Sequence, residues 1–260
     1  FGLLGNLLNH QLGHSDGLSL ALSVGVAIVA LIVYWLFTRF VEGKPFSDFA
    51  LTGALREWRM GAFIGAAAMA LTIGAIAAFG GYHVTGTHSL DVLVPVLGMA
   101  IMSGVWEEIL MRGLIFRFIE QWLGSWVALA ISAGLFGAAH LANPNATALA
   151  AFAIAIEAGI LLAAIYMMTR RLWAAVGLHM AWNFTQGGIF GVAVSGGDTP
   201  GILANRISGP DLLTGGPFGA EASLPAILIC TTIGLICLYR ARSDGQFVPM
   251  SWQRFKTGKA

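Results

Sequence analysis

The chain has 260 residues, of which 57% are hydrophobic and 10% charged, and its formal net charge is +1. Soluble domains carry about 25% charged residues, so the composition excludes a soluble globular protein, and the near-neutral charge gives no sign of a nucleic-acid partner. The mean hydropathy of +0.77 is typical of a protein that crosses a lipid bilayer several times.

The whole chain, residues 1–260, is expected to form one integral membrane domain. Residues 1–17 place leucines and a phenylalanine on one helical face, a pattern that suits a helix lying in the membrane interface. We expect residues 18–240 to form a transmembrane bundle and residues 241–260 to form a cytoplasmic tail.

Several segments are apolar and long enough to cross about 30 Å of hydrocarbon as helices. We predict seven such segments, and they are Leu18–Thr38, Met60–Phe79, Leu90–Phe118, Ser125–Leu141, Thr147–Thr169, Leu172–Phe190 and Glu221–Tyr239. The predicted fold is therefore an all-α polytopic membrane bundle. Within it, Gly61 and Gly65 form a GxxxG pair, a spacing that lets membrane helices pack closely. Cys230 and Cys237 lie about 10.5 Å apart along one helix, too far for a disulfide.

Basic residues predict the orientation of the bundle. Thirteen of the 14 lysines and arginines fall on one side of the predicted spans, and Arg206 falls on the other. An excess of lysine and arginine marks the cytoplasmic side, so the N-terminus should face outward and the C-terminus should face the cytoplasm. The longest connection, residues 192–222, lies outside, where it is either mobile or folded over the bundle as a cover.

Two adjacent glutamates and an arginine interrupt the third apolar segment, in the stretch SGVWEEILMRGLIF. A charged side chain near the bilayer centre costs about 2.5–3.5 kcal/mol, so Glu107 and Glu108 need partners. Residues four apart share a helix face, which predicts that Arg112 pairs with Glu108. Glu107 points about 100° away and needs either a proton or a histidine from a neighbouring segment.

Two histidines in other segments are candidates for that partner. His140 ends the fourth segment with Phe136 one turn before it, and His179 lies in the sixth with Asn183 one turn later. A carboxylate and a histidine can activate water, and a histidine with an asparagine can donate hydrogen bonds to an oxyanion. Each side chain alone is explained by an interhelical hydrogen bond, but the combination fits hydrolysis of an amide inside the membrane.

Two further glutamates are predicted to be structural. Glu157 lies in the fifth segment, where we expect a structural role or a lipid site. Glu221 begins the seventh segment, where the helix dipole favours a carboxylate at the membrane interface.

The same residues carry a resemblance to a known family. EEILMR matches an EExxxR motif at Glu107, Glu108 and Arg112, FGAAH matches FxxxH, and HMAWN matches HxxxN. In this order on successive apolar segments, the motifs resemble the CAAX-protease and bacteriocin-processing family of intramembrane endopeptidases, also called the Abi family. The resemblance covers residues 90–190.

The resemblance implies roles for the polar residues. Glu107 and His140 would activate the water that attacks the peptide bond, and His179 and Asn183 would stabilise the oxyanion. Structural support of the site is expected from Glu108, Arg112 and Phe136.

We expect no metal cofactor, because the HExxH spacing of the zincins is absent. Two carboxylates and two histidines are nevertheless able to hold zinc. The alternative zinc ligands are Glu107, Glu108, His140 and His179.

The expected partners are the lipid bilayer and membrane-associated peptide or protein substrates, in a multi-pass protein of a bacterial inner membrane, with other membrane subunits left open. Prenylated CAAX substrates are a eukaryotic attribute and are not expected. The alternative function is a non-catalytic membrane scaffold or accessory subunit that retains the motif residues. An ion carrier using Glu107 and Glu157 is disfavoured, since the sequence lacks the repeat halves of transporters.

Overall fold

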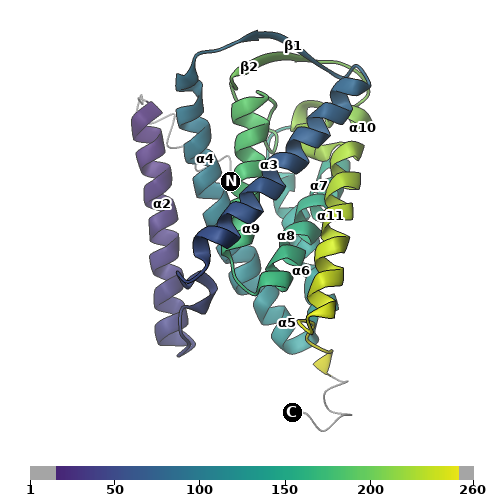
Figure 1. Ribbon diagram of the computed structural model, residues 1–260. Helices are drawn as coiled ribbons and strands as arrows, with labels where there is room; N and C mark the ends of the chain where they lie inside the picture. Colours follow the sequence, from purple (N-terminus) through teal and green to yellow (C-terminus); the bar gives the residue numbers. More distant parts are fainter. Residues whose placement is uncertain (1–15, 252–260) are drawn as a thin grey trace.

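The computed structural model describes residues 16–251, which fold into a bundle of helices (Figure 1). The predicted interfacial helix of residues 1–17 lies outside the described residues except for its last two, and so does the end of the predicted tail.

Six helical segments of the described chain are long and apolar enough to cross a membrane. They are Asp16–Val41, Ala54–Ala78, Leu90–Leu123, Ser125–Ala142, Ala148–Thr169 and Leu224–Ser243. The all-α multi-pass membrane bundle is confirmed. The predicted sixth span corresponds to two consecutive elements of 11 and 6 residues, together one residue shorter than the 18-residue segment Ser125–Ala142. The count of seven spans therefore stays a prediction.

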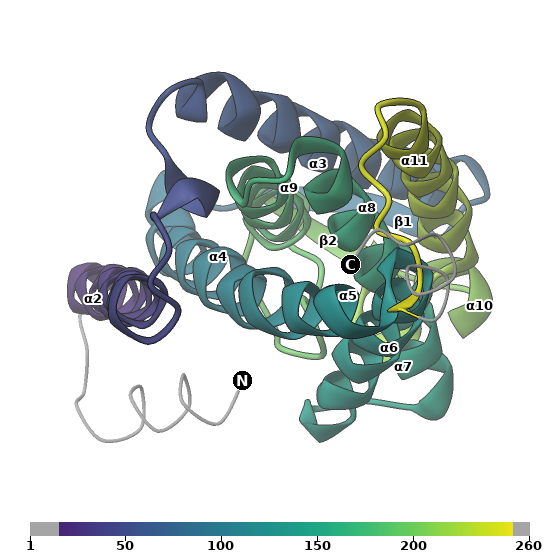
Figure 2. The same cartoon turned by 90° about the horizontal axis from the view of Figure 1, so that it is seen from below.

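The longer helices surround a buried centre. Their bounds are α2 (Asp16–Leu36), α3 (Ala54–Ala78), α4 (Leu93–Glu108), α5 (Arg117–Leu123), α6 (Ser125–Ala139), α7 (Ala148–Ile154), α8 (Leu161–Thr169), α9 (Trp173–Asn183) and α11 (Leu224–Ser243). Helix α9 lies near the middle and packs against α3, α4 and α8 (Figure 2). Helix α11 covers α8, whereas α2 lies at one edge of the bundle against α4. The short α9 is thus a core helix with little surface toward lipid.

Four π-helical turns occur in the described chain, each continuing an α-helix. They are η1 (Phe37–Val41), η4 (Ile109–Phe116), η6 (Ala155–Ile160) and η7 (Phe184–Ile189). Such turns contain more residues per turn than an α-helix and are frequent at functional sites. In η4, the carbonyl oxygen of Gly113 accepts hydrogen bonds from the Tyr34 hydroxyl at 3.2 Å and from Arg117 Nε at 2.7 Å.

Glycines let α3 and α9 approach closely. A Cβ atom at Gly61 would lie 1.9 Å from the carbonyl oxygen of Ala174, and one at Gly65 would lie 2.2 Å from that of Leu178. The close packing predicted for this GxxxG pair is confirmed, and its partner is α9.

Three arginines at one end of the bundle form ion pairs with glutamates from other elements. The ion pairs are Arg117–Glu42, Arg170–Glu120 and Arg171–Glu57, with N–O distances of 2.7, 2.5 and 2.8 Å. They join the loop after α2 to helix α5, and they join α5 and α3 to the turn between α8 and α9. Arg206 lies at the opposite end, on a strand. This separation is the one expected for a cytoplasmic end rich in basic residues, although the orientation itself stays a prediction.

A two-stranded antiparallel sheet crosses the opposite end (Figure 1). Strand β1 (Tyr82–Thr87) pairs with β2 (Leu203–Ile207) in a register that places Tyr82 opposite Ile207. The strands were not predicted from the sequence. They tie the long connection of residues 192–222 across the bundle, so this connection is folded as a cover. The remaining short turns are η2 (Ser47–Phe49), η3 (Leu90–Val92), η5 (His140–Ala142), α10 (Asp211–Thr214), η8 (Gly216–Phe218) and η9 (Ala220–Ala222).

Candidate active site

The EExxxR stretch lies where α4 passes into the π turn η4. Arg112 Nη1 donates to Glu108 Oε1 at 2.9 Å, and the two side chains are 1% and 0% exposed. The predicted pairing of these residues is confirmed. The pair is buried, so the charge of each side chain depends on the other for stabilisation.

Arg112 has further contacts beyond its own helix. Its Nη2 donates to the carbonyl oxygens of Ala158 and Gly159 in η6, at 3.1 and 3.2 Å. The guanidinium also lies over the ring of Phe136, with its central carbon 4.7 Å from the ring centroid, within the range of a cation–π contact. Arg112 thereby connects η4 to α6 and to η6.

His179 connects α9 to both glutamates. Its Nδ1 lies 2.8 Å from Glu108 Oε1, and its Nε2 lies 3.8 Å from Glu107 Oε2. A carboxylate accepts hydrogen bonds, so Nδ1 carries a proton. The sequence predicted a histidine partner for Glu107 but did not show that the stronger contact of His179 is with Glu108.

His140 directly follows α6, as the first residue of the short turn η5, and its side chain is buried. Its Nδ1 lies 2.7 Å from the carbonyl oxygen of Phe136, and the two rings are 4.7 Å apart. The carbonyl has no proton to give, so Nδ1 donates and Nε2 is left as an acceptor in the neutral ring.

Asn183 is held by a residue that the sequence did not single out. Its Nδ2 donates to the hydroxyl oxygen of Ser103 at 3.0 Å. Ser103 lies four residues before Glu107 on α4, so it presents the same helix face. The spacing of four residues between Ser103 and Glu107 is the sequence feature from which this position could have been predicted.

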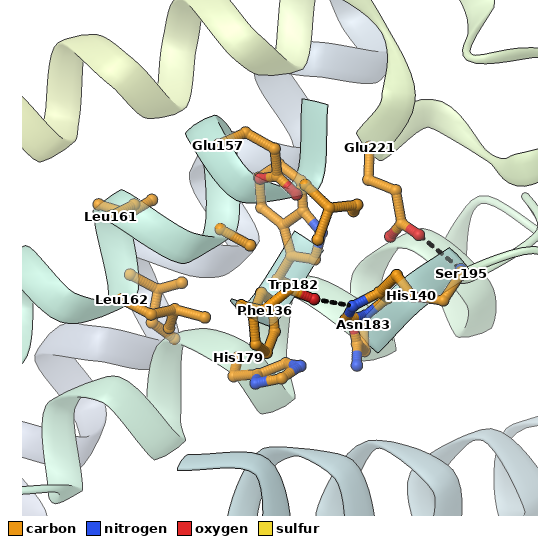
Figure 3. A pocket seen from close by; sticks show the side chains of 13 residues that line it. Phe136, His140, Glu157, Leu161, Leu162, His179, Trp182, Asn183, Ser195 and Glu221 are labelled. Carbon is orange, nitrogen blue, oxygen red and sulfur yellow. Dashed lines mark hydrogen bonds between the residues drawn. The ribbon is translucent and has the colours of Figure 1, made fainter. Parts of the chain in front are cut away.

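A cavity of about 20 Å³ lies between the two histidines and the connection of residues 192–222. It has enough space for one water molecule. It is lined by Phe136, His140, Ile154, Glu157, Ala158, Leu161, Leu162, Leu178, His179, Trp182, Asn183, Ser195 and Glu221 (Figure 3). The structure thus brings His140, His179 and Asn183 together around one space. The lining includes no EExxxR residue among the described residues.

Both glutamates predicted to be structural line this cavity. Glu157 and Glu221 are each 2% exposed, so neither lies at a lipid-facing or interfacial surface. Glu221 precedes the N-cap of α11, which is Ser223, and it accepts a hydrogen bond from the backbone N–H of Ser195 at 2.5 Å. Glu221 lies within the connection of residues 192–222, called the cover loop below, and it is buried there before α11 begins. Its carboxylate is therefore not in the first turn of the helix, as was expected, and its structural role stays a prediction.

The zinc alternative concerns the arrangement of the glutamates and histidines. No three His, Cys, Asp or Glu side chains within residues 16–251 are grouped so as to hold a metal ion. The Nδ1 atoms of His140 and His179 are already bonded to Phe136 and Glu108. Metal-binding histidines commonly donate their other ring N–H in this way, so both Nε2 atoms stay open, and the zinc alternative and metal independence of the reaction both stay predictions.

The fold and the site define a multi-pass membrane protein with an enclosed cluster of carboxylates, histidines and an asparagine. Residues 89–185 match the family model described as type II CAAX prenyl endopeptidase Rce1-like. The match contains the EExxxR, FxxxH and HxxxN motifs, and it supports the assignment of the chain to the CAAX-protease family of intramembrane proteases. Comparisons with curated proteins and with solved structures gave no match.

Proposed function

We propose that this protein is an intramembrane endopeptidase that hydrolyses peptide bonds with a water molecule activated by Glu107 and His140. The main support for this proposal is the hydrogen bond that fixes the His140 ring. Its Nδ1 is occupied by the Phe136 carbonyl at 2.7 Å, which leaves Nε2 free to accept a hydrogen bond or a proton in a buried residue.

The proposed reaction uses four side chains. His140, His179 and Asn183 line the cavity, and Glu107 lies outside the lining, with its Oε2 3.8 Å from His179 Nε2. The water oxygen attacks the carbonyl carbon while one of its protons passes to Glu107, and its other hydrogen bonds to His140 Nε2. The oxyanion accepts hydrogen bonds from His179 Nε2–H and from the Asn183 amide. The carbon–nitrogen bond then breaks, and the proton on Glu107 passes to the leaving amine. The products are a carboxylic acid and an amine.

Glu108, Arg112 and Phe136 support this site without touching the substrate. Glu108 fixes the His179 ring through Nδ1, and Arg112 holds Glu108 from the same helix. Phe136 supplies both the carbonyl bonded to His140 and the ring beneath Arg112.

The proposed substrates are membrane-associated or hydrophobic peptides, such as leader or pro-peptide segments, and the proposed location is the inner membrane of a bacterium. Both rest on the family resemblance. The prenylated substrates in the description of the matched family are not part of the proposal.

Hydrolysis of a hydrophobic peptide library by the purified protein tests the function. Wild type, Glu107→Gln and the matched control Glu57→Gln are compared, each with and without a chelator. Glu57 is paired with Arg171 at the far end of the bundle, so its variant should cleave as wild type does.

Cleavage that is lost in Glu107→Gln and kept with the chelator is the expected result. Loss with the chelator would instead make the protein a metalloenzyme. Cleavage by no form, with the fold intact, would favour the scaffold alternative.

A further inference from the structure

Two buried carboxylates line the cavity and have no part in the proposed reaction. Figure 3 shows the side chains of Glu157 and Glu221 pointing into the space shared with His140, His179 and Asn183. Glu157 comes from the π turn η6, and Glu221 comes from the turn η9 that precedes α11. Both line the cavity, whereas Glu107 and Glu108 do not.

Glu157 lacks a full set of partners. Its Oε1 is buried and has no hydrogen-bond partner among the described residues, and its other contact is with the thiol of Cys230. A thiol is a weak donor. A buried carboxylate oxygen without a donor is costly, so a ligand that donates hydrogen bonds in this cavity would stabilise it.

The balance of charge points to a cation. The buried site holds the carboxyl groups of Glu107, Glu108, Glu157 and Glu221 against the guanidinium of Arg112 and the imidazoles of His140 and His179. Even when Arg112 and a protonated His179 are both counted as cations, two of the four carboxyl groups remain without a balancing cation. They need protons or a cationic ligand, because unpaired buried charge is unfavourable.

The size of the space restricts the cation. A volume of about 20 Å³ accepts a group no larger than one water molecule. A primary ammonium has this size and three donor hydrogens, whereas the planar guanidinium of arginine is larger.

We propose that Glu157 and Glu221 form a subsite that binds one primary ammonium group of the peptide substrate beside the scissile bond. The ammonium comes either from a lysine side chain or from a free peptide N-terminus. Glu157 Oε1 is the primary acceptor, and Glu221 is the second carboxylate. This inference rests on the proposed function, since it makes the protease selective for substrates with an ammonium near the cleaved bond.

Binding tests the subsite without hydrolysis. Fluorescent hydrophobic peptides that differ only in lysine, arginine or the neutral isostere norleucine at one position are titrated onto the detergent-solubilised Glu107→Gln protein. The lysine peptide should bind about tenfold more tightly than the norleucine peptide, the usual size for a hydrogen bond to a charged group. The arginine peptide should gain less. Acetylation of the peptide N-terminus distinguishes the two sources of the ammonium.

Adding Glu157→Gln to the same protein should bring the lysine-to-norleucine ratio close to one. Adding Glu57→Gln as a matched control should leave the ratio unchanged. Glu221→Gln is a second, independent variant of the subsite, and its ratio should also fall. Equal binding of lysine and norleucine peptides, or a ratio that survives both subsite variants, overturns the proposal.

Hydrolysis of the norleucine peptide separates this proposal from the proposed function. Cleavage by wild type with no preference for lysine overturns the subsite and keeps the protease. A lysine preference in binding without cleavage by wild type keeps the subsite as a ligand site and removes the protease.

Discussion

Glu108 is the residue on which the buried polar site depends most. Its Oε1 accepts from Arg112 at 2.9 Å and lies 2.8 Å from His179 Nδ1. One carboxylate therefore holds a guanidinium from its own helix and an imidazole from α9. Losing it leaves a buried arginine without its charge partner, which costs more than losing the whole pair.

Glu108→Ala should lower the free energy of unfolding by about 3–5 kcal/mol, because Arg112 is left buried and unpaired. Arg112→Ala should destabilise to a similar extent. The double variant Glu108→Leu/Arg112→Met should lose less than the sum of the single variants, measured by thermal and denaturant unfolding in detergent. Additive losses, or wild-type stability in both single variants, would contradict the pairing.

Asn183→Ala should lower turnover by about 10²–10³-fold, the usual loss for an oxyanion donor. Ser103→Ala should lower it less, because Ser103 acts only by positioning the Asn183 amide. Ser132→Ala is the control, since this buried hydroxyl bonds only within α6. An unchanged rate in Asn183→Ala would remove the role assigned to it.

At the residue scale, the sequence predicts contacts within a helix but not between helices. The spacing of four residues predicted the pairing of Glu108 with Arg112 and the shared face of His179 and Asn183. It did not predict that His179 Nδ1 contacts Glu108, because that choice depends on the rotation of α9 against α4. The position of Glu221 in the cavity lining was not predicted, because the fold of the cover loop has no periodic signal.

At the element scale, the π turns accompany the motif residues. Glu107 and Glu108 end the helix that η4 continues, Asn183 precedes η7, and Glu157 lies in η6. No hydropathy period distinguishes a π turn from an α turn, so the sequence could not place them. The carbonyls of Ala158 and Gly159 that hold Arg112 belong to one of these turns.

The packing of α3 on α9 gives a prediction with an internal control. Gly61→Ala should destabilise the protein by about 1–3 kcal/mol, as for other overpacked contacts, because its Cβ would lie 1.9 Å from the Ala174 carbonyl oxygen. Gly74→Ala on the same helix has nothing within 4 Å, and it should stabilise by up to about 1 kcal/mol through helix propensity. Unfolding in detergent measures both, and equal effects would contradict the close approach.

At the scale of the whole molecule, the two ends of the bundle are closed differently. Ion pairs join the loops at the basic end, and the sheet with the long cover loop closes the other. Composition and span length predicted the bundle. The sheet was not predictable, because its strands lie more than a hundred residues apart and contain glycine and polar residues typical of loops.

The cover loop makes stability depend on pH through Glu221. Burial raises the pKa of this carboxyl from 4.5 to about 7. The folded chain then keeps a proton that the unfolded chain has lost. The contribution of Glu221 to stability is therefore full below pH 4.5 and is lost as the pH rises through 7.

That loss amounts to roughly 3 kcal/mol. Melting temperatures in detergent between pH 4.5 and pH 8 should fall more steeply for wild type than for Glu221→Gln, whose amide does not titrate. Parallel curves for the two proteins would show that Glu221 has an ordinary pKa.

The π turns have a consequence for the comparison of relatives. A π turn differs from an α turn by a single inserted residue, and four such insertions lie within the described chain. A relative with a regular helix at one of these positions would keep the same site while its chain is one residue shorter there. Alignments of such relatives therefore require single-residue gaps beside the motifs, and a search that fixes the number of residues between motifs would miss true members of the family.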